Sequence, residues 1–113
     1  MTSKNWQLAT DAALRYQTIL VPAILGPFAK ALVDWATLSP ESVVVDIGCG
    51  TGAATRFAAE KLGQSGRVIG VDVNAGMLEV AQSLPKADGA PIEWRQESVY
   101  TLTLDDNFAD AVL

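Results

Sequence analysis

The sequence has 113 residues, half of them apolar, and 8 basic against 13 acidic side chains give a formal net charge of −5. It shows no basic stripe, so its composition argues against nucleic-acid binding. The single Cys49 excludes an internal disulfide and is typical of a reducing compartment, so we expect a cytoplasmic protein. The lack of histidine argues against a metal centre and against imidazole base catalysis.

The first 40 residues predict a helical segment. Thr10 and Asp11 can cap a helix that runs to about residue 20, and Pro22 is expected to end it. A second helix is expected from about Pro27 to residue 35, where apolar side chains recur at helical spacing. The longest apolar stretch, residues 19–25, contains Pro22 and is too short to cross a bilayer, so we expect no membrane association.

Residues 41–113 have the pattern of alternating strands and helices. The β-branched run 43–45 lacks polar alternation, which indicates a strand buried on both faces of a parallel sheet. The expected elements are strands at 43–47, 67–71, 92–94 and from 108, and helices at 53–62 and 75–83, with 99–107 ambiguous. This order predicts an α/β, Rossmann-like parallel sheet with flanking helices, and a domain boundary between residues 40 and 41.

The turn after the first strand, residues 48–52, contains three glycines. Glycine lets the chain turn sharply and lets a ligand approach the backbone, while the N–H groups of the next helix can hold an anionic group. Asp72 lies 20 residues beyond Gly52, at the end of the second strand, where its carboxylate can accept hydrogen bonds from two ribose hydroxyls. The combination predicts a nucleoside-binding site.

Gly48-x-Gly50-x-x-Ala53 also fits the dinucleotide pattern of oxidoreductases. Three features argue against it. A carboxylate such as Asp46 is costly at the end of an apolar strand unless it is hydrogen-bonded to a functional loop or ligand. Gly52 adds a third glycine at the wrong spacing for the dinucleotide turn. About 40 residues precede the first strand, whereas dinucleotide domains often begin at that strand. An oxidoreductase fragment remains an alternative, as does a non-catalytic binding or assembly module.

Residues 46–52, Asp-Ile-Gly-Cys-Gly-Thr-Gly, resemble the first motif of class I S-adenosylmethionine-dependent methyltransferases, close to the ubiquinone/menaquinone-biosynthesis type. Residues 71–78 resemble their second motif. The resemblance implies that a loop holds the methionine portion of S-adenosylmethionine, that Asp46 supports this loop, and that Asp72, next to Val73, binds the ribose. Met77 would pack on the adenine, with a core role as the alternative. The loop residues are Gly48, Cys49, Gly50, Thr51 and Gly52.

A third motif of this family is weaker here. Glu97 and Ser98 replace the expected Asp-Ala pair, and the resemblance implies that Glu97 accepts a bond from the adenine amino group while the Ser98 N–H donates to the ring. A solvated loop is the alternative. Tyr16 would cover the amino-acid end of the cofactor or belong to the core. We expect Cys49 to be a small filler, not a nucleophile, and Trp6, Trp35 and Trp94 to be packing residues.

The family's sheet has seven strands, and this sequence corresponds to the first four. The resemblance therefore implies a methyltransferase that acts on a small-molecule acceptor, with this chain supplying the cofactor-binding part of an incomplete fold. No catalytic residue can be named, because the later strands carry much of the acceptor pocket. An apolar fourth strand at the sheet edge would template pairing with another copy, so we expect this chain to form a homodimer.

Overall fold

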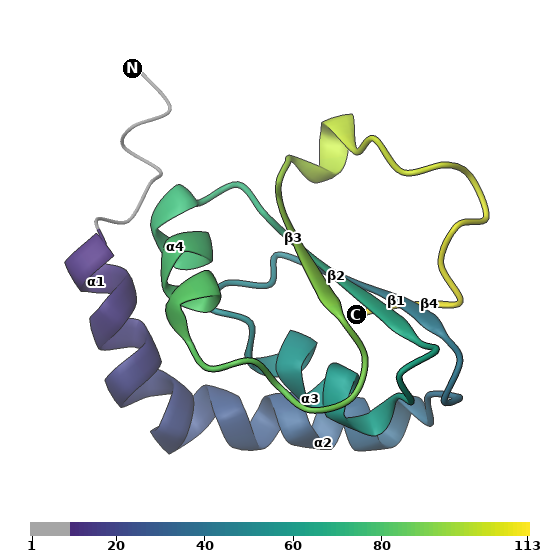
Figure 1. Cartoon of the computed structure of the whole chain (residues 1–113). Coiled ribbons are helices and arrows are strands. Elements are labelled where there is room, and N and C mark those ends of the chain that lie inside the picture. Colours follow the sequence, from purple (N-terminus) through teal and green to yellow (C-terminus); the bar gives the residue numbers. More distant parts are fainter. Residues whose placement is uncertain (1–9) are drawn as a thin grey trace.

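A computed structural model describes residues 10–113 (Figure 1). Four parallel strands form one sheet in the order β3-β2-β1-β4. The strands are β1 (Val43–Ile47), β2 (Arg67–Asp72), β3 (Ile92–Gln96) and β4 (Ala111–Val112). Helix α3 (Ala53–Lys61) joins β1 to β2, helix α4 (Ala75–Ser83) joins β2 to β3, and the 3-10 helix η3 (Val99–Thr101) precedes β4. The predicted α/β, Rossmann-like class is confirmed.

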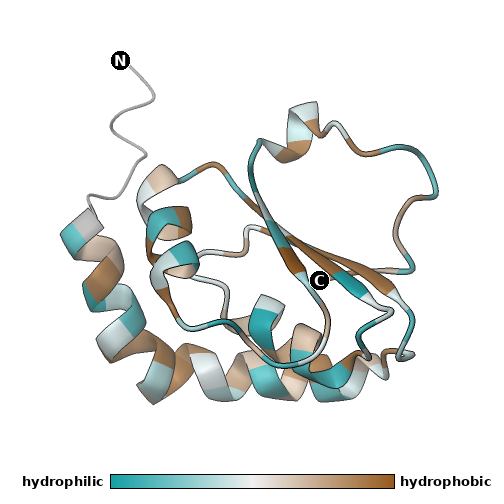
Figure 2. Ribbon diagram, in the orientation of Figure 1, coloured by the Kyte–Doolittle hydropathy of each residue, from teal (hydrophilic) through white to brown (hydrophobic). Residues whose placement is uncertain are grey.

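The central strands are buried on both faces, as their β-branched residues predicted. Val44 and Val68 are fully buried and form a cluster with side chains of the helices on one side of the sheet. Val45 and Ile69 pack on the opposite side, against partly buried apolar side chains of the segment between β3 and β4. Figure 2 shows the resulting apolar centre along these strands.

The N-terminal segment differs from the prediction. Helix α1 (Thr10–Arg15), the π-helix η2 (Tyr16–Leu25) and helix α2 (Gly26–Ala36) follow one another without a break and form one helix that bends between α1 and α2 (Figure 1). We call this bent helix the rod. The expectation that Pro22 ends a helix is therefore wrong. The Gly26 N–H bonds the Val21 carbonyl, and this wider i→i+5 turn keeps the chain helical past a proline that lacks a donor.

Among the described residues, Asp11–Ala36 is the one helix that could cross a membrane by length and composition, with a mean hydropathy of 1.5. Core helices of soluble proteins and signal sequences near an N-terminus pass the same test. This helix is much longer than the apolar stretch 19–25 because it continues through Pro22, and the expectation of no membrane association stays a prediction. In this structure the rod packs against α3 and α4.

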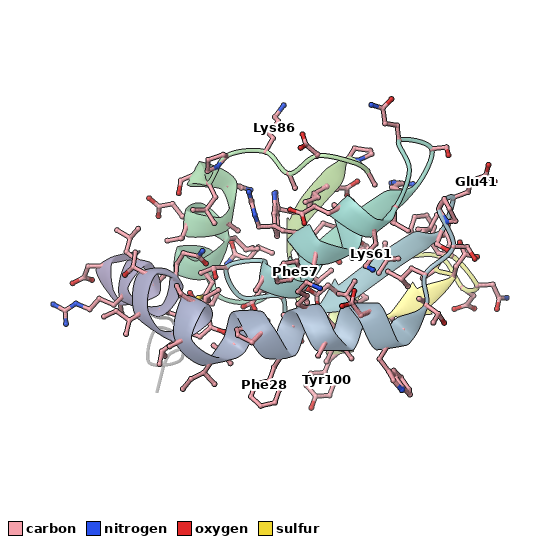
Figure 3. All side chains as sticks on the ribbon, turned by 90° about the horizontal axis from the view of Figure 1, so that it is seen from below. Phe28, Glu41, Phe57, Lys61, Lys86 and Tyr100 are labelled. Atoms are coloured by element: carbon pink, nitrogen blue, oxygen red, sulfur yellow. The ribbon has the colours of Figure 1, made fainter. Side chains whose placement is uncertain are left out.

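The rod packs on α3 through both charged and apolar side chains. Asp34 of α2 pairs with Lys30 on its own helix and with Lys61 of α3, at 2.9 and 2.8 Å. Figure 3 shows Lys61 and Phe57 between the two helices. The predicted division at residue 40 stays a prediction, and the described residues on its two sides pack together.

The rod carries large apolar side chains that are exposed. These are Leu14, Ile19, Leu20, Ile24, Phe28, Leu32 and Trp35. Figure 3 shows Phe28 and Tyr100 pointing away from the molecule on the same side. Trp35 is 82% exposed, so the expectation that it is a packing residue is wrong. Trp6 lies outside the described residues.

Candidate functional site

The turn between β1 and α3 is built on three glycines in the left-handed region. Gly48, Gly50 and Gly52 have φ values of 69°, 59° and 91°, which other residues adopt at a cost. The N–H groups of Gly48 and Cys49 donate to the carbonyl of Val71 at 2.7 and 2.9 Å, which fixes the turn to the end of β2. A Cβ atom at Gly48 would have nothing within 4 Å, so this part of the turn borders open space.

Asp72, the last residue of β2, joins the first motif to the second. One carboxylate oxygen accepts the Gly50 N–H at 2.8 Å, and the other accepts the Asn74 N–H, also at 2.8 Å. Each oxygen of a carboxylate can accept a further bond. Because Asp72 is only partly buried, a ligand hydroxyl can reach it.

Asp46 lies beneath the start of α3. It is only 6% exposed, and its carboxylate accepts the hydroxyl of the fully buried Thr55 at 2.6 Å. Burial raises the pKa of Asp46 and the negative charge of Asp72 adds to this rise, while hydrogen bonds from Thr55 oppose it. The carboxylate thus supports the first turn of α3, and its predicted support of the glycine turn stays a prediction.

The rod reaches the turn at the start of η2. The Thr51 hydroxyl donates to the side-chain oxygen of Gln17, and a Cβ atom at Gly50 would lie 3.6 Å from the Tyr16 hydroxyl oxygen. Burial raises the pKa of Tyr16, and the charge of Asp72 adds to the effect. Sequence reasoning missed Gln17, because its contact depends on how the rod docks and no local pattern marks it.

Met77 and Val73 differ in their surroundings. Met77 is 8% exposed and packs with Ala13 and Val80, while Tyr16 packs against the same cluster. This is the core role that the sequence left as the alternative, and contact with adenine stays a prediction. Val73 follows Asp72 and is 48% exposed, so its side chain is open to a ligand.

The third motif lies beside the second, because the Glu97 N–H donates to the Asp72 carbonyl at 3.1 Å. The Glu97 carboxylate accepts the Thr103 N–H and hydroxyl at 2.8 and 2.9 Å, and these bonds lower its pKa. The Ser98 side chain accepts the Tyr100 N–H at 3.2 Å. Both bonds use Oε1, while Oε2 lies 3.6 Å from an Arg95 nitrogen and can accept a further bond. The adenine contact of Glu97 stays a prediction.

Cys49 has the surroundings of a filler. It is half-buried, and burial, followed by the charges of Asp46 and Asp72, raises the pKa of its thiol far above the ordinary value. A thiol of this kind is not ionised at neutral pH, so it is a poor nucleophile.

Residues 44–113, more than half of the chain, match the family described as the methyltransferase domain. The chain belongs to this family. It is 42% identical over 65 residues to the 2-phytyl-1,4-naphtoquinone methyltransferase of Thermosynechococcus vestitus, and the matched segment covers 57% of this chain and 28% of that protein. It is 45% identical over 56 residues to the aklanonic acid methyltransferase DauC of a Streptomyces strain, which covers 50% of this chain and 26% of that protein.

A solved structure with the same fold is the magnesium protoporphyrin IX methyltransferase of Synechocystis, determined with bound SAH. The TM-score is 0.62 at 23% sequence identity, and the alignment covers 77% of this chain and 40% of that one. This methyltransferase-family chain thus spans well under half the length of the relatives that it matches.

Proposed function

We propose that this chain binds S-adenosylmethionine and serves a methyl transfer to a small-molecule acceptor. The observation that carries the proposal is the bond between Asp72 and the Gly50 N–H, which brings both motifs of a methyltransferase-family chain to one point. That point lies at the carboxyl ends of β1 and β2, where ligands of open α/β sheets bind.

The residues present fit this cofactor. The glycine turn borders open space at Gly48, and Asp72 is the partly buried acceptor that a ribose needs. When bound, S-adenosylmethionine would supply a methyl group already activated on a sulfonium. The chain's own part is to hold and orient it and to exclude water, and orientation alone can contribute ~7–11 kcal/mol to such a reaction.

Isothermal titration with S-adenosylhomocysteine (SAH), beside NADH, tests the proposal. We expect SAH to bind and NADH not to. The variant Asp72→Ala should weaken SAH binding by about tenfold or more, because a charged acceptor of two hydroxyls is lost. Asp88→Ala, which removes an exposed carboxylate, is the control and should bind normally. Binding of NADH in place of SAH would favour the oxidoreductase alternative.

The acceptor that we propose is a small molecule, since the names of the relatives include a naphthoquinone and a porphyrin methyltransferase. We further propose that the protein works in the cytoplasm, which its single cysteine supports. A methyl-transfer assay on the 113-residue chain with quinone and porphyrin acceptors separates an enzyme from a binding module. A module would bind SAH and transfer nothing.

We also propose that the 113-residue chain associates into homodimers. The exposed apolar side of the rod and the exposed Val112 on β4 both support this proposal.

A further inference from the structure

Three positions on the helical side of the sheet form a row across its strands. The register pairs Asp46 of β1 with Gly70 of β2, and Gly70 with Trp94 of β3. The middle position has no side chain, and the indole of Trp94 fills its place. A Cβ atom at Gly70 would lie 2.8 Å from the Cε3 and Cζ3 atoms of this ring, so only glycine fits there.

The same indole reaches the last glycine of the turn. A Cβ atom at Gly52 would lie 2.4 Å from the Cη2 atom of Trp94 and 2.9 Å from its Cζ3 atom. Gly52 is the residue before α3, and its carbonyl accepts the Arg56 N–H, the first bond of that helix. The ring edge of Trp94 thus packs against the junction between the turn and α3.

The Trp94 ring also borders a cavity. Trp94 lines a cavity of about 610 Å³ between α3, α4 and the loop before β3, together with small side chains such as Ala81 and Ala90. A ring buried only to fill the core would be enclosed by apolar side chains on all sides. Here the ring has close contacts with Gly70 and Gly52 and also borders free space.

We propose that Trp94 is a positioning residue for cofactor binding. Its indole crosses over Gly70 and holds Gly52, which fixes the direction of the first turn of α3 and of the N–H groups that this turn presents. The inference rests on the proposed binding of S-adenosylmethionine and adds a residue of β3, outside the glycine turn and Asp72, to the site.

The test is a double-variant cycle on SAH affinity, measured by isothermal titration. Gly70→Ala pushes the ring off Gly52 and should weaken SAH binding by roughly tenfold or more, as small misplacements of binding groups do. Trp94→Leu should weaken it similarly. The double variant Gly70→Ala/Trp94→Leu should bind like Trp94→Leu alone, because without the ring the two contacts at 2.8 Å are gone and the new methyl group keeps only the contact with the Cys49 sulfur at 3.2 Å.

Two controls separate this role from others. A Cβ atom at Gly70 would also lie 3.2 Å from the Cys49 sulfur, so Gly70→Ala/Cys49→Ala is made as well. The proposal would be overturned if Gly70→Ala/Cys49→Ala regained the SAH affinity of the unmodified chain while the effects of Gly70→Ala and Trp94→Leu simply added in their double variant. Trp35→Leu removes an exposed tryptophan and should leave SAH affinity unchanged.

A spectroscopic readout adds a measurement that a purely structural role would not change. In the variant Trp6→Phe/Trp35→Phe, Trp94 is the one remaining tryptophan, and its emission should shift on saturation with SAH. If Trp94→Leu does not fold, Trp94→Phe removes the ring edge that reaches Gly52 and takes its place. Normal SAH binding by the Trp94 variants overturns this inference alone, whereas no SAH binding by the unmodified chain overturns the proposed function too.

Discussion

Asp46 shows how one buried charge can serve the site at a cost to the fold. Its pKa in the folded protein lies above the ordinary 3.8, so the folded state holds a proton on this carboxyl more readily than the unfolded chain does. Ionised Asp46 therefore lowers the free energy of unfolding at neutral pH. This penalty disappears as the pH falls through the raised pKa toward 3.8.

The variants Asp46→Asn and Asp46→Ala separate charge from hydrogen bonding. At pH 7 we expect Asp46→Asn to melt at or above the temperature of the unmodified chain, and this difference to narrow as the pH is lowered to 4. Asp46→Ala should lose about 1–3 kcal/mol, because the buried Thr55 hydroxyl loses its acceptor. Thermal melts of the three proteins across this pH range measure both effects. A constant difference between Asp46→Asn and the unmodified chain would show that Asp46 titrates normally.

At the scale of elements, helix α2 joins the core through one of its faces, where it packs on α3. Val33 is 1% exposed and belongs to the core cluster of Val44 and Val68, whereas Phe28 on the same helix is 72% exposed. We expect Val33→Ala to lower the free energy of unfolding by roughly 1–3 kcal/mol, because it leaves a cavity. Phe28→Ala should change it by less than about 0.5 kcal/mol. Urea unfolding curves decide, and equal midpoints for the two variants would mean that α2 does not pack as described.

The elements that could be predicted are those whose signal is local. The strand at 43–47 follows from its β-branched residues, and the helix 75–83 from Asn74, whose side chain accepts the Met77 N–H at 3.1 Å. The helix end expected at Pro22 was wrong, since a π-helical stretch has no local mark. The contacts of Gln17 and Trp94 with the glycine turn were missed for a related reason. Both side chains reach the turn only once the rod and β3 are in place.

At the scale of the whole molecule, the exposed apolar surface lies mostly on the rod. We call Ile24 of η2 and Phe28, Leu32 and Trp35 of α2 the outer face of the rod, and each of them is at least 43% exposed. The open edge at β4 is a two-residue strand, and such short edges pair weakly. Stable interfaces bury about 800 Å² on each partner, which a long apolar helix face supplies more readily than a short strand. The proposed homodimer should therefore form through the outer face.

Light scattering on the 113-residue chain at increasing concentration tests this arrangement. We expect a dimer at tens of micromolar, because the net charge of −5 spread over the chain opposes association only modestly. Phe28→Glu places a charge in the centre of the outer face and should shift the chain to a monomer, while Val112→Lys at the β4 edge should leave the dimer intact. Melting temperatures of both variants serve as folding controls. If Val112→Lys yields the monomer and Phe28→Glu does not, the copies pair through their strands, as an open sheet edge would favour.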